Sequence, residues 1–581
     1  MFNFYTKKSR WLRVIPLAML MSLVGSVWSY AATYYSKAAS TNFADVASWG
    51  ANTDGSGAAP GSISNADDFI IQNGSAMVLN ATAAVRTLTI NAGSLTVSAN
   101  TLTVAIAGVN NSNLTVNTGG TLTVSGGTVN VDGQFAVLGT AAFNQSAGSI
   151  NVDGNAAGVS ANSVASGSGI VRFTSSVLNL TGGTLTIVDP HANTTASLAF
   201  DYNTGTAYNS GAGHTFRFGN GVSTDAGGNA TNGFRHSTWT GSGRFLFGAV
   251  VVDALAGTNR FITSNYSHGM ASLTVNSGDY RTTSAPCAIA GNITVNGSGT
   301  LTANSTIQLS TYLGGTTAPT PNAQTISGAG VFRNLTASPT ANFTNLTINN
   351  SNATGVTFSG ANSMLSGAVT GTVSGTLNFT TGKVTCTGGT FILGISAATP
   401  GTFTYTAGGF TSGSTFRRWL ATTTLTTSAT PTTNAFPFVV GNLNRNVRMN
   451  KVGGNLTTGG WIEANHTDAS GLAAAGFLDG AYSVDQRTNA SWTMNSGGGI
   501  ALGARTLAVG LNGEGLIVTA AAPGTAPRLV QAAGAVKTHS PGLGSTSAPI
   551  ASRVDFVLAD LAGPHYIGIA NADIGLYSVA S

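Results

Sequence analysis

Charged side chains are scarce in this sequence: Asp, Glu, Lys and Arg make up 7% of its 581 residues, against about 25% in typical soluble domains. Hydrophobic residues still make up 42%, so the chain can bury a large core and lacks the composition of a disordered protein. The surface must therefore be covered mainly by Thr, Ser, Asn and Gly. Neutral polar surfaces of this kind are common on extracellular repeat proteins and suit contact with sugars.

A basic region is also missing beyond the first residues. The formal charge of the whole chain is +5, but four of its 24 basic residues are Lys7, Lys8, Arg10 and Arg13. The remainder carries 20 basic and 19 acidic residues, a formal charge of +1. Nucleic-acid binding needs a concentrated basic footprint, so we expect no nucleic-acid partner.

Carboxylates are few, and Glu is almost absent: only Glu463 and Glu514 occur. Between Asp279 and Asp468 the single carboxylate is Glu463. Glycoside hydrolysis usually uses two carboxylates, and a calcium-dependent lyase needs an acidic cluster with a nearby base. No nucleotide loop, nucleophile elbow or zinc motif stands out either. We expect no catalytic residues, no metal and no cofactor, and keep a polysaccharide lyase or hydrolase as the alternative.

Three acidic dipeptides are interpreted as turn elements rather than as metal sites. Asp67-Asp68 is the only adjacent acidic pair and directly precedes an apolar run. Asp132-Gly133 and Asp153-Gly154 are dipeptides typical of turns.

Only two cysteines are present, Cys287 and Cys386. If coils of about 20 residues stack at about 4.8 Å, these positions lie roughly 24 Å apart. A disulfide requires Cα atoms within about 7 Å. We therefore expect the two cysteines to be unpaired, although an exported protein could form disulfides.

Long hydrophobic runs are absent except near the N-terminus. The segment from Val14 to Val27 is mostly apolar, follows four basic residues and precedes the small residues around Ala31 and Ala32. This pattern predicts a secretory signal peptide, residues 1–31, cleaved near Ala31 or Ala32. An uncleaved anchor is the alternative, but the run falls short of the roughly 20 residues that span a membrane. We expect a secreted or outer-surface protein with no transmembrane segment in its mature chain.

What the sequence contains in abundance is a short apolar-Thr-apolar unit followed by a turn of Gly, Asn or Ser. The apolar side chains point to one face of a strand and the Thr to the other, so each unit predicts a short strand with one dry face. The unit occurs at residues 88–90, 95–97, 102–104, 114–116, 122–124, 185–187, 273–275, 293–295 and 346–348.

The spacing of these units predicts a solenoid. The first five units are 7, 7, 12 and 8 residues apart, which favours three strands and three turns per coil. The 77 glycines supply turns such as Thr118-Gly119-Gly120. Stacked coils share one interior and stabilise one another. The expected fold is all-β, a right-handed parallel β-helix; an antiparallel sandwich or barrel is the alternative, but its strands are usually longer.

Changes in residue composition and in the repeat pattern divide the chain into four parts. We expect a signal peptide at 1–31, an N-terminal cap at 32–65, a parallel β-helix at 66–400 with irregular, aromatic-rich coils at 191–290, and a β-sandwich at 401–581. Trp419, Trp461 and Trp492 and longer strands mark the last part.

Short motifs at both ends resemble one family. Residues 34–37 (YYSK) and 47–50 (ASWG) near the start, and residues 436–441 (FPFVVG), 491–493 (SWT) and 565–569 (HYIGI) near the end, are similar to those of adhesin-like β-helical surface proteins exported by the type IX system of Bacteroidetes. The resemblance implies surface display or secretion and brings no catalytic residues. Members of that family continue into a C-terminal sorting domain that this sequence does not contain.

The region 191–290 is the best candidate for ligand binding. It holds four of the seven histidines, and aromatic rings beside hydrogen-bonding groups are what a sugar site uses. The alternative is that these side chains decorate longer loops or line a wider coil. The candidate ligand-binding residues are Tyr202, Arg217, Arg235, His236, Trp239, Arg244, Tyr266 and His268.

Outward Thr-x-Thr pairs raise ice binding as a minor alternative. A threonine ladder needs such pairs on one face of successive coils, and Thr101 to Thr121 is one plausible coil, although position 141 is Ala. The structural interpretation is that Thr favours strands. The pairs are Thr87/Thr89, Thr101/Thr103, Thr121/Thr123, Thr184/Thr186 and Thr300/Thr302.

The sequence therefore favours a non-catalytic extracellular or cell-surface scaffold, adhesin-like, with polysaccharide or extracellular matrix as its expected partner.

Overall fold

The protein is all-β in the computed structural model, apart from two single-turn 3-10 helices, η2 (Val46–Ser48) and η3 (Leu558–Leu561). This confirms the predicted all-β class. The described residues are 31–105, 112–153, 169–189, 198–204, 206–221, 235–236, 245–253, 261–264, 267–283, 285–310, 322–334, 341–359, 369–425, 434–479, 482–516, 527–532, 534–535 and 550–572. The predicted signal peptide lies almost entirely outside these ranges. Within them, no helix is long and apolar enough to span a bilayer.

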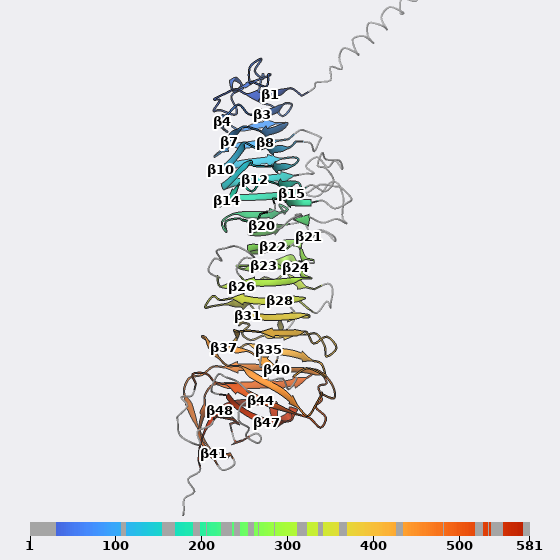
Figure 1. The fold of residues 1–581 in the computed structure, drawn as a ribbon, viewed down its shortest axis with the longest axis vertical. Helices are drawn as coiled ribbons and strands as arrows, with labels where there is room; N and C mark the ends of the chain where they lie inside the picture. Colours follow the sequence, from blue (N-terminus) through green and yellow to red (C-terminus); the bar gives the residue numbers. More distant parts are fainter. Residues whose placement is uncertain are drawn as a thin grey trace, which may run out of the picture.

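The strands form a tall column with the N-terminal residues at one end and the C-terminal strands at the other (Figure 1). Among the described residues, one 34-stranded sheet accounts for most of the column. Its strands are β1 (Thr33–Ser36), β2 (Trp49–Gly50), β3 (Asp68–Ile71), β4 (Ser75–Val78), β5 (Ala83–Val85), β6 (Thr87–Ile90), β7 (Gly93–Val97), β8 (Thr101–Val104), β9 (Leu114–Val116), β10 (Gly120–Val131), β11 (Phe135–Val137), β12 (Ala142–Asp153), β13 (Val171–Phe173), β14 (Leu178–Leu180), β15 (Thr184–Asp189), β16 (Leu198–Tyr202), β17 (Tyr208–Asn209), β18 (Thr215–Phe218), β19 (Arg235–His236), β20 (Phe245–Asp253), β21 (Phe261–Ser264), β22 (His268–Thr282), β23 (Cys287–Ile289), β24 (Ile293–Ala303), β25 (Thr306–Ser310), β26 (Gln324–Ser327), β27 (Val331–Arg333), β28 (Asn345–Asn350), β29 (Val356–Phe358), β31 (Thr376–Thr385), β33 (Thr402–Tyr405), β34 (Gly409–Thr411), β37 (Phe438–Val440) and β38 (Leu443–Asn444).

Two smaller sheets hold the remaining strands. A 10-stranded sheet contains β30 (Val369–Val373), β32 (Thr390–Leu393), β35 (Thr415–Leu420), β40 (Gly460–Thr467), β41 (Leu472–Asp479), β42 (Tyr482–Thr488), β43 (Ser491–Gly497), β45 (Pro527–Gln531), β46 (Gly534–Ala535) and β48 (Pro564–Ala572). A 4-stranded sheet contains β36 (Ala435–Phe436), β39 (Val447–Val452), β44 (Thr506–Asn512) and β47 (Ile550–Phe556).

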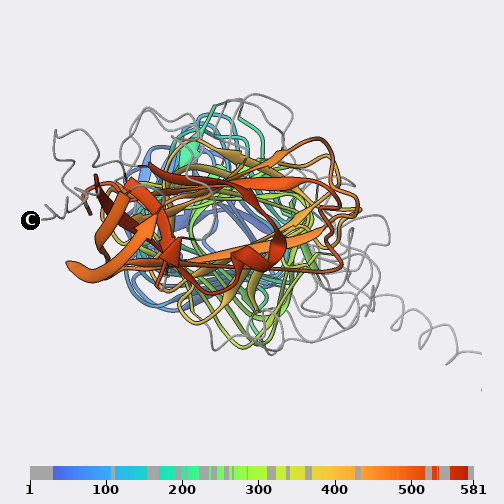
Figure 2. The same cartoon turned by 90° about the horizontal axis from the view of Figure 1, so that it is seen from below.

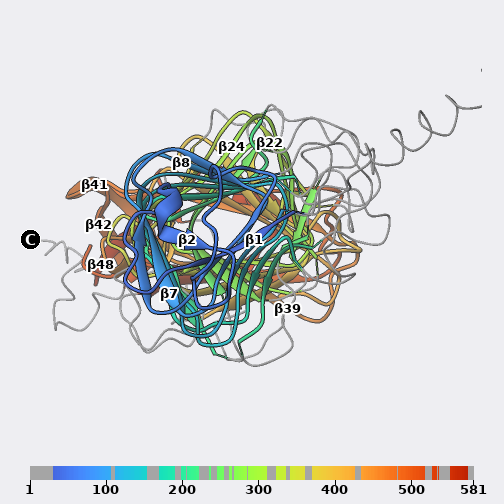
Figure 3. The same ribbon diagram turned by 90° about the horizontal axis from the view of Figure 1, so that it is seen from above.

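Parallel pairing between successive strands builds the column. Strand β6 pairs in parallel with β9, β9 with β11, and β11 with β13. Leu88, Leu114, Phe135 and Val171 occupy equivalent positions along this run, and all four are fully buried. Because side chains alternate along a strand, the aligned register keeps every dry face on the inside. Figures 2 and 3 look along the column and show the successive strands around one interior.

The register corrects the expected coil from Thr101 to Thr121. Thr101 is aligned with Thr128, whereas Thr121 is aligned with Ser94 on one side and Ala142 on the other. The period here is 27 residues instead of 20, because this coil carries extra residues between β8 and β9. A fixed spacing could not reveal which turn of the coil is longer.

Phenylalanine side chains fill the middle of the column. Phe135, Phe143 and Phe173 contact one another at centroid distances of 5.1 to 5.8 Å. The run continues with edge-to-face contacts through Phe200 and Phe216. Edge-to-face packing is a favoured arrangement of aromatic rings, so aromatic rings fill this part of the interior together with buried aliphatic side chains such as Ile150 and Leu185.

The first described residues fold over the N-terminal end of the column. Phe43 and Trp49 are fully buried, and their rings contact Phe69 of β3 at centroid distances of 6.3 and 4.8 Å. The Trp49 Nε1 group donates to the Phe43 carbonyl oxygen at 2.9 Å. This segment thus covers apolar surface that the first coil leaves open.

Strand pairing changes from parallel to antiparallel in the C-terminal part. Strand β35 pairs in parallel with β32 on one side and antiparallel with β40 on the other. Parallel pairing thus continues past residue 401, as far as β34 with β37. One cluster of buried hydrophobic residues extends from Phe43 to Ile567. The predicted boundary at 400/401 therefore falls inside a continuous run of parallel strands.

Candidate functional site

Two of the predicted ligand-binding residues belong to the core. Tyr202 is fully buried and its hydroxyl donates to the Thr206 carbonyl oxygen at 3.0 Å. His268 is also fully buried, with Nε2 2.5 Å from the Tyr280 hydroxyl oxygen. Neither side chain is placed to contact a ligand from solvent. The interpretation that polar residues of 191–290 line the wider coils fits these two positions.

Arg217 lies on the surface but is held by an acidic partner. Its Nε and one Nη group donate to the same carboxylate oxygen of Asp253, at 2.9 and 2.6 Å. The other predicted residues stay predictions. Arg235 and His236 form β19, of which only the backbone is described, and Trp239, Arg244 and Tyr266 lie outside the described residues.

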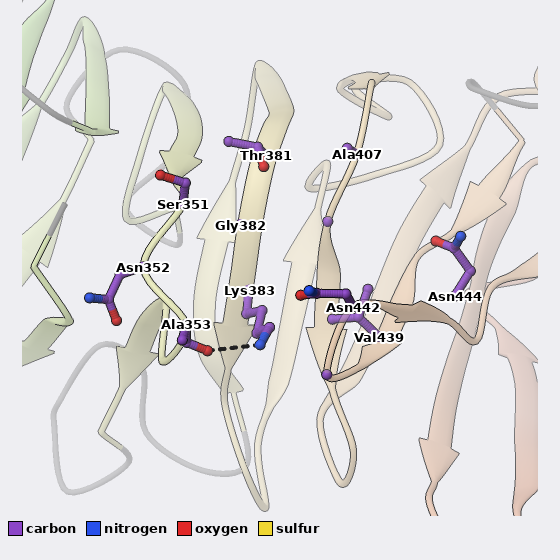
Figure 4. A pocket seen from close by; sticks show the side chains of 12 residues that line it. Ser351, Asn352, Ala353, Thr381, Gly382, Lys383, Ala407, Val439, Asn442 and Asn444 are labelled. Carbon is purple, nitrogen blue, oxygen red and sulfur yellow. Dashed lines mark hydrogen bonds between the residues drawn. The ribbon is translucent and has the colours of Figure 1, made fainter. Parts of the chain in front are cut away.

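A polar groove lies further along the column, at residues that the sequence did not single out (Figure 4). It has a volume of about 280 Å³. Four chain segments line it, each from a different coil or turn, and together they bring amide, hydroxyl and ammonium groups to one surface. The lining residues are Ser351, Asn352, Ala353, Thr381, Gly382, Lys383, Ala407, Gly408, Val439, Gly441, Asn442 and Asn444.

Hydrogen bonds hold several of these side chains in place. Lys383 Nζ donates to the Ala353 carbonyl oxygen at 2.8 Å, which ties two neighbouring segments together. Asn444 donates from both its backbone N and its Nδ2 to Glu514 Oε2, each at 3.0 Å. These contacts orient the side chains before any ligand arrives. Convergent donors and acceptors in a concave surface are suited to a hydroxyl-rich ligand.

The groove could not be found from motifs, because its residues come from strands and turns that are about 30 residues apart in sequence. Only the register of β28 with β31 and of β34 with β37 brings these turns together. A signal does exist in the local composition, since Ser351, Asn352 and Asn442 are polar residues in or beside turns. Turn residues of this kind recur throughout the sequence, so composition alone does not single these out.

The dipeptides at Asp132 and Asp153 come together on a second surface. Asp132 and Asp153 each follow directly after the aligned residues Val131 and Val152 of β10 and β12. Burial and the nearby Asp153 carboxylate raise the pKa of Asp132 to about 6. Asp153 is in turn aligned with Asp189 at the end of β15. The turn interpretation therefore missed a carboxylate pair that only the register reveals.

The Asp67-Asp68 pair has local partners. Asp67 accepts from the Ala32 backbone N at 3.1 Å, and Asp68 forms an ion pair with Arg86 and accepts from the Thr87 hydroxyl at 2.6 Å. Throughout the described ranges, no group of three His, Cys, Asp or Glu residues could hold a metal ion. Cys287 and Cys386 are both buried, and no disulfide joins them.

A column of hydroxyl groups lies along one outer face. Thr101, Thr128, Ser149, Thr184 and Thr215 are aligned in five successive strands. The column two residues further along each strand holds Asn130 and Asn151 between Thr103 and Thr186, and Asn151 Nδ2 donates to Asn130 Oδ1 at 2.9 Å. The paired threonines that ice binding requires are thus separated by asparagines on this face.

Comparisons with family models, curated proteins and solved structures found no match.

Proposed function

We propose that this chain is a non-catalytic extracellular or cell-surface scaffold that binds glycans or matrix polysaccharide. Its column is a right-handed parallel β-helix, residues 32–65 are its cap, and the antiparallel C-terminal strands form a β-sandwich that joins it to an anchor. The parallel register of successive strands supports the β-helix. The predicted signal peptide and the resemblance to proteins exported by the type IX system support display outside the cell.

The polar groove carries the binding part of this proposal. Amide and hydroxyl groups of Asn352, Thr381, Asn442 and Asn444 line it, and Lys383 is its single charged side chain. Such a set hydrogen-bonds the hydroxyl groups of a sugar without needing a charged ligand. Its position on the wall of a long column leaves room for a polymer that extends beyond the groove.

Binding to a panel of neutral and acidic polysaccharides, with release of reducing ends followed in the same samples, tests the proposal on the mature chain. We expect binding without new reducing ends. Lys383→Met should weaken the interaction with a groove-bound glycan roughly tenfold, since the loss of one hydrogen bond to a charged donor corresponds to about 1.5 kcal/mol.

Lys37→Met is the matched control, because Lys37 Nζ also donates to a backbone carbonyl at 2.8 Å but lies at the cap. Equal losses in the two variants, or no binding to any glycan, would reject the groove as the site.

A polysaccharide-degrading enzyme is the second candidate, and the Asp132–Asp153 pair is the observation that favours it. The backbones that carry Asp132 and Asp153 are neighbours in parallel register, and two neighbouring carboxylates are what a retaining glycosidase uses. A pKa of about 6 at Asp132 suits a general acid. Release of reducing ends by the unmodified chain that disappears in Asp132→Asn would establish this candidate and reject the non-catalytic one.

A further inference from the structure

Arginine and threonine alternate in backbone register across five successive strands, β19, β21, β22, β24 and β27. In backbone register, Arg235 is aligned with Thr263, Thr263 with Arg281, Arg281 with Thr302, and Thr302 with Arg333. An arginine therefore stands in every second strand. At a strand spacing of about 4.8 Å, consecutive arginines of this column are roughly 10 Å apart.

The two arginines of this column whose side chains are described face outward in β22 and β27, whereas Thr302 in β24 is 0% exposed. The residues just before Arg281, Thr302 and Arg333 are Tyr280, Leu301 and Phe332, which are 1%, 0% and 4% exposed. Side chains alternate along a strand, so the arginine column lies on the opposite, outer face. The side chains of Arg281 and Arg333 are 22% and 37% exposed.

One carboxylate holds two of these arginines. Asp279 Oδ2 accepts from Arg281 Nε at 2.8 Å and from Arg333 Nη2 at 2.7 Å. Arg333 Nε also donates to the Thr302 hydroxyl at 3.1 Å, and that hydroxyl donates to Asp279 Oδ1 at 2.7 Å. Two guanidinium groups are thus fixed in position by one shared carboxylate.

The cluster differs in this respect from other surface arginines of the chain. Arg86 is paired with Asp68, Arg217 with Asp253, and Arg417 with Glu463, one carboxylate each. At Arg333, the hydrogen bonds to described residues come from Nε and Nη2, so Nη1 of this exposed guanidinium still offers a donor. Guanidinium groups bind carboxylate and sulfate oxygens through such donors.

We propose that this arginine column binds a linear acidic polysaccharide, a uronate or sulfated glycan, that lies along the axis of the β-helix. The partly exposed guanidinium groups of Arg281 and Arg333 complement an anionic polymer, and the interval of roughly 10 Å between arginines matches a polymer whose charged groups recur at a regular interval. This inference rests on the proposed function and names a second ligand class for it, because the polar groove recognises neutral hydroxyl groups. A duplex nucleic acid fits less well, since the column is one arginine wide.

The test measures binding of the full mature chain to polygalacturonate, dextran sulfate and neutral dextran at low salt. We expect binding to one or both acidic polymers that weakens as salt rises, because exposed charges are screened. Arg281→Gln/Arg333→Gln should weaken that binding at least roughly tenfold, the effect of losing a charged hydrogen bond. Arg333→Lys keeps the charge without the guanidinium, and should lose part of the affinity.

Arg86→Gln is the matched control, because the Arg86 side chain is 33% exposed and has its own carboxylate. Circular dichroism shows whether each variant is folded. If the double variant does not fold, the affinity of Arg333→Lys for the acidic polymers tests the inference instead. Unchanged binding in the arginine variants, or an equal loss in Arg86→Gln, overturns the inference. Equal affinity of the chain for a DNA duplex and for the acidic polysaccharides also overturns the inference.

The results also separate this inference from the proposed function. Binding to neutral glycans alone overturns the arginine column and leaves the scaffold in place. If the chain binds none of the three polymers and none of the other glycans of the panel, both the arginine column and the proposed function are overturned.

Discussion

At the residue scale, buried histidine side chains make the stability of this fold depend on pH. His214 is fully buried, and its Nε2 lies 3.0 Å from Gln145 Oε1. Its Nδ1 has no hydrogen-bond partner among the described residues. Burial disfavours the charged imidazolium and lowers the pKa of His214 from 6.5 to about 4. His466 is also fully buried, and burial lowers its pKa to about 4 as well.

These histidines predict that the protein loses stability in mild acid. The unfolded chain binds a proton near pH 6.5, whereas the folded chain binds it only near pH 4. The stabilisation is therefore fully present above pH 6.5 and is lost as the pH falls towards 4. The loss at His214 amounts to about 3 kcal/mol, at about 1.4 kcal/mol per pKa unit. Urea unfolding at pH 7 and pH 4.5 measures it.

The variant His214→Gln isolates this contribution. Its free energy of unfolding should fall less between pH 7 and pH 4.5 than that of the unmodified chain. The raised pKa of Asp132, about 6, acts in the opposite direction, since the stability it contributes is lost as pH rises. That contribution is common to both proteins and cancels in the comparison. Identical pH slopes would contradict the prediction.

Residue identity alone predicted the site poorly, for a physical reason. Tyr202 and His268 carry the groups that a sugar site uses, but the pleat turns both towards the interior. The alternation of side chains fixes that direction only when the strand is known, and β16 and β22 lie in the least regular part of the sequence. Arg217 lies on the surface, but its partner Asp253 is 36 residues away and comes close only through the register.

At the element scale, sharp corners between strands depend on glycine. Gly148 lies in β12 with a φ of +72°, a conformation that L-residues rarely adopt. A Cβ atom at this position would lie 2.5 Å from the Gly126 carbonyl oxygen of the preceding coil. The bend at Gly148 is thus in direct contact with the bend at Gly126 in the preceding coil.

Gly148→Ala should therefore destabilise the protein by roughly 1–3 kcal/mol, the cost of a strained backbone conformation. Thermal unfolding measures the change. Gly297→Ala is the control, since Gly297 lies within β24 and a Cβ there meets nothing within 4 Å. It should be neutral or slightly stabilising. A melting temperature for Gly148→Ala equal to that of Gly297→Ala would contradict the account of the corner.

The elements themselves were largely predictable, and the alignment between them was not. Units such as Leu88-Thr89-Ile90 and Leu122-Thr123-Val124 are strands with the expected buried and outward faces. The predicted alignment of Thr101 with Thr121 was wrong because the length of a coil varies. A turn tolerates extra residues without disturbing the strands on either side. Register therefore has to come from the structure, and with it the groove, the carboxylate pair and the arginine column.

At the scale of the whole molecule, the two ends of the column are the parts most prone to self-association. A stack of parallel strands leaves unpaired backbone groups and apolar surface at each end, and such edges promote association. Phe43 and Trp49 cover apolar surface at the N-terminal end. Phe43 N donates to the Val78 carbonyl oxygen at 3.0 Å, and Val78 N donates to the Thr41 carbonyl oxygen at 2.7 Å.

Loosening this cover should convert the molecule into a self-associating one. In Phe43→Ser/Trp49→Ala, two rings that pack on Phe69 are lost while Tyr34 remains, and removal of large buried aromatic side chains costs about 3–5 kcal/mol each. The edges of β3 and β4 then become available to a second copy, so sedimentation should show concentration-dependent association. Lys37→Met, which alters an exposed cap residue, should sediment as the unmodified chain does. A double variant that also sediments unchanged would mean that the first coil does not need its cover, and that the column resists association through its own edge strands.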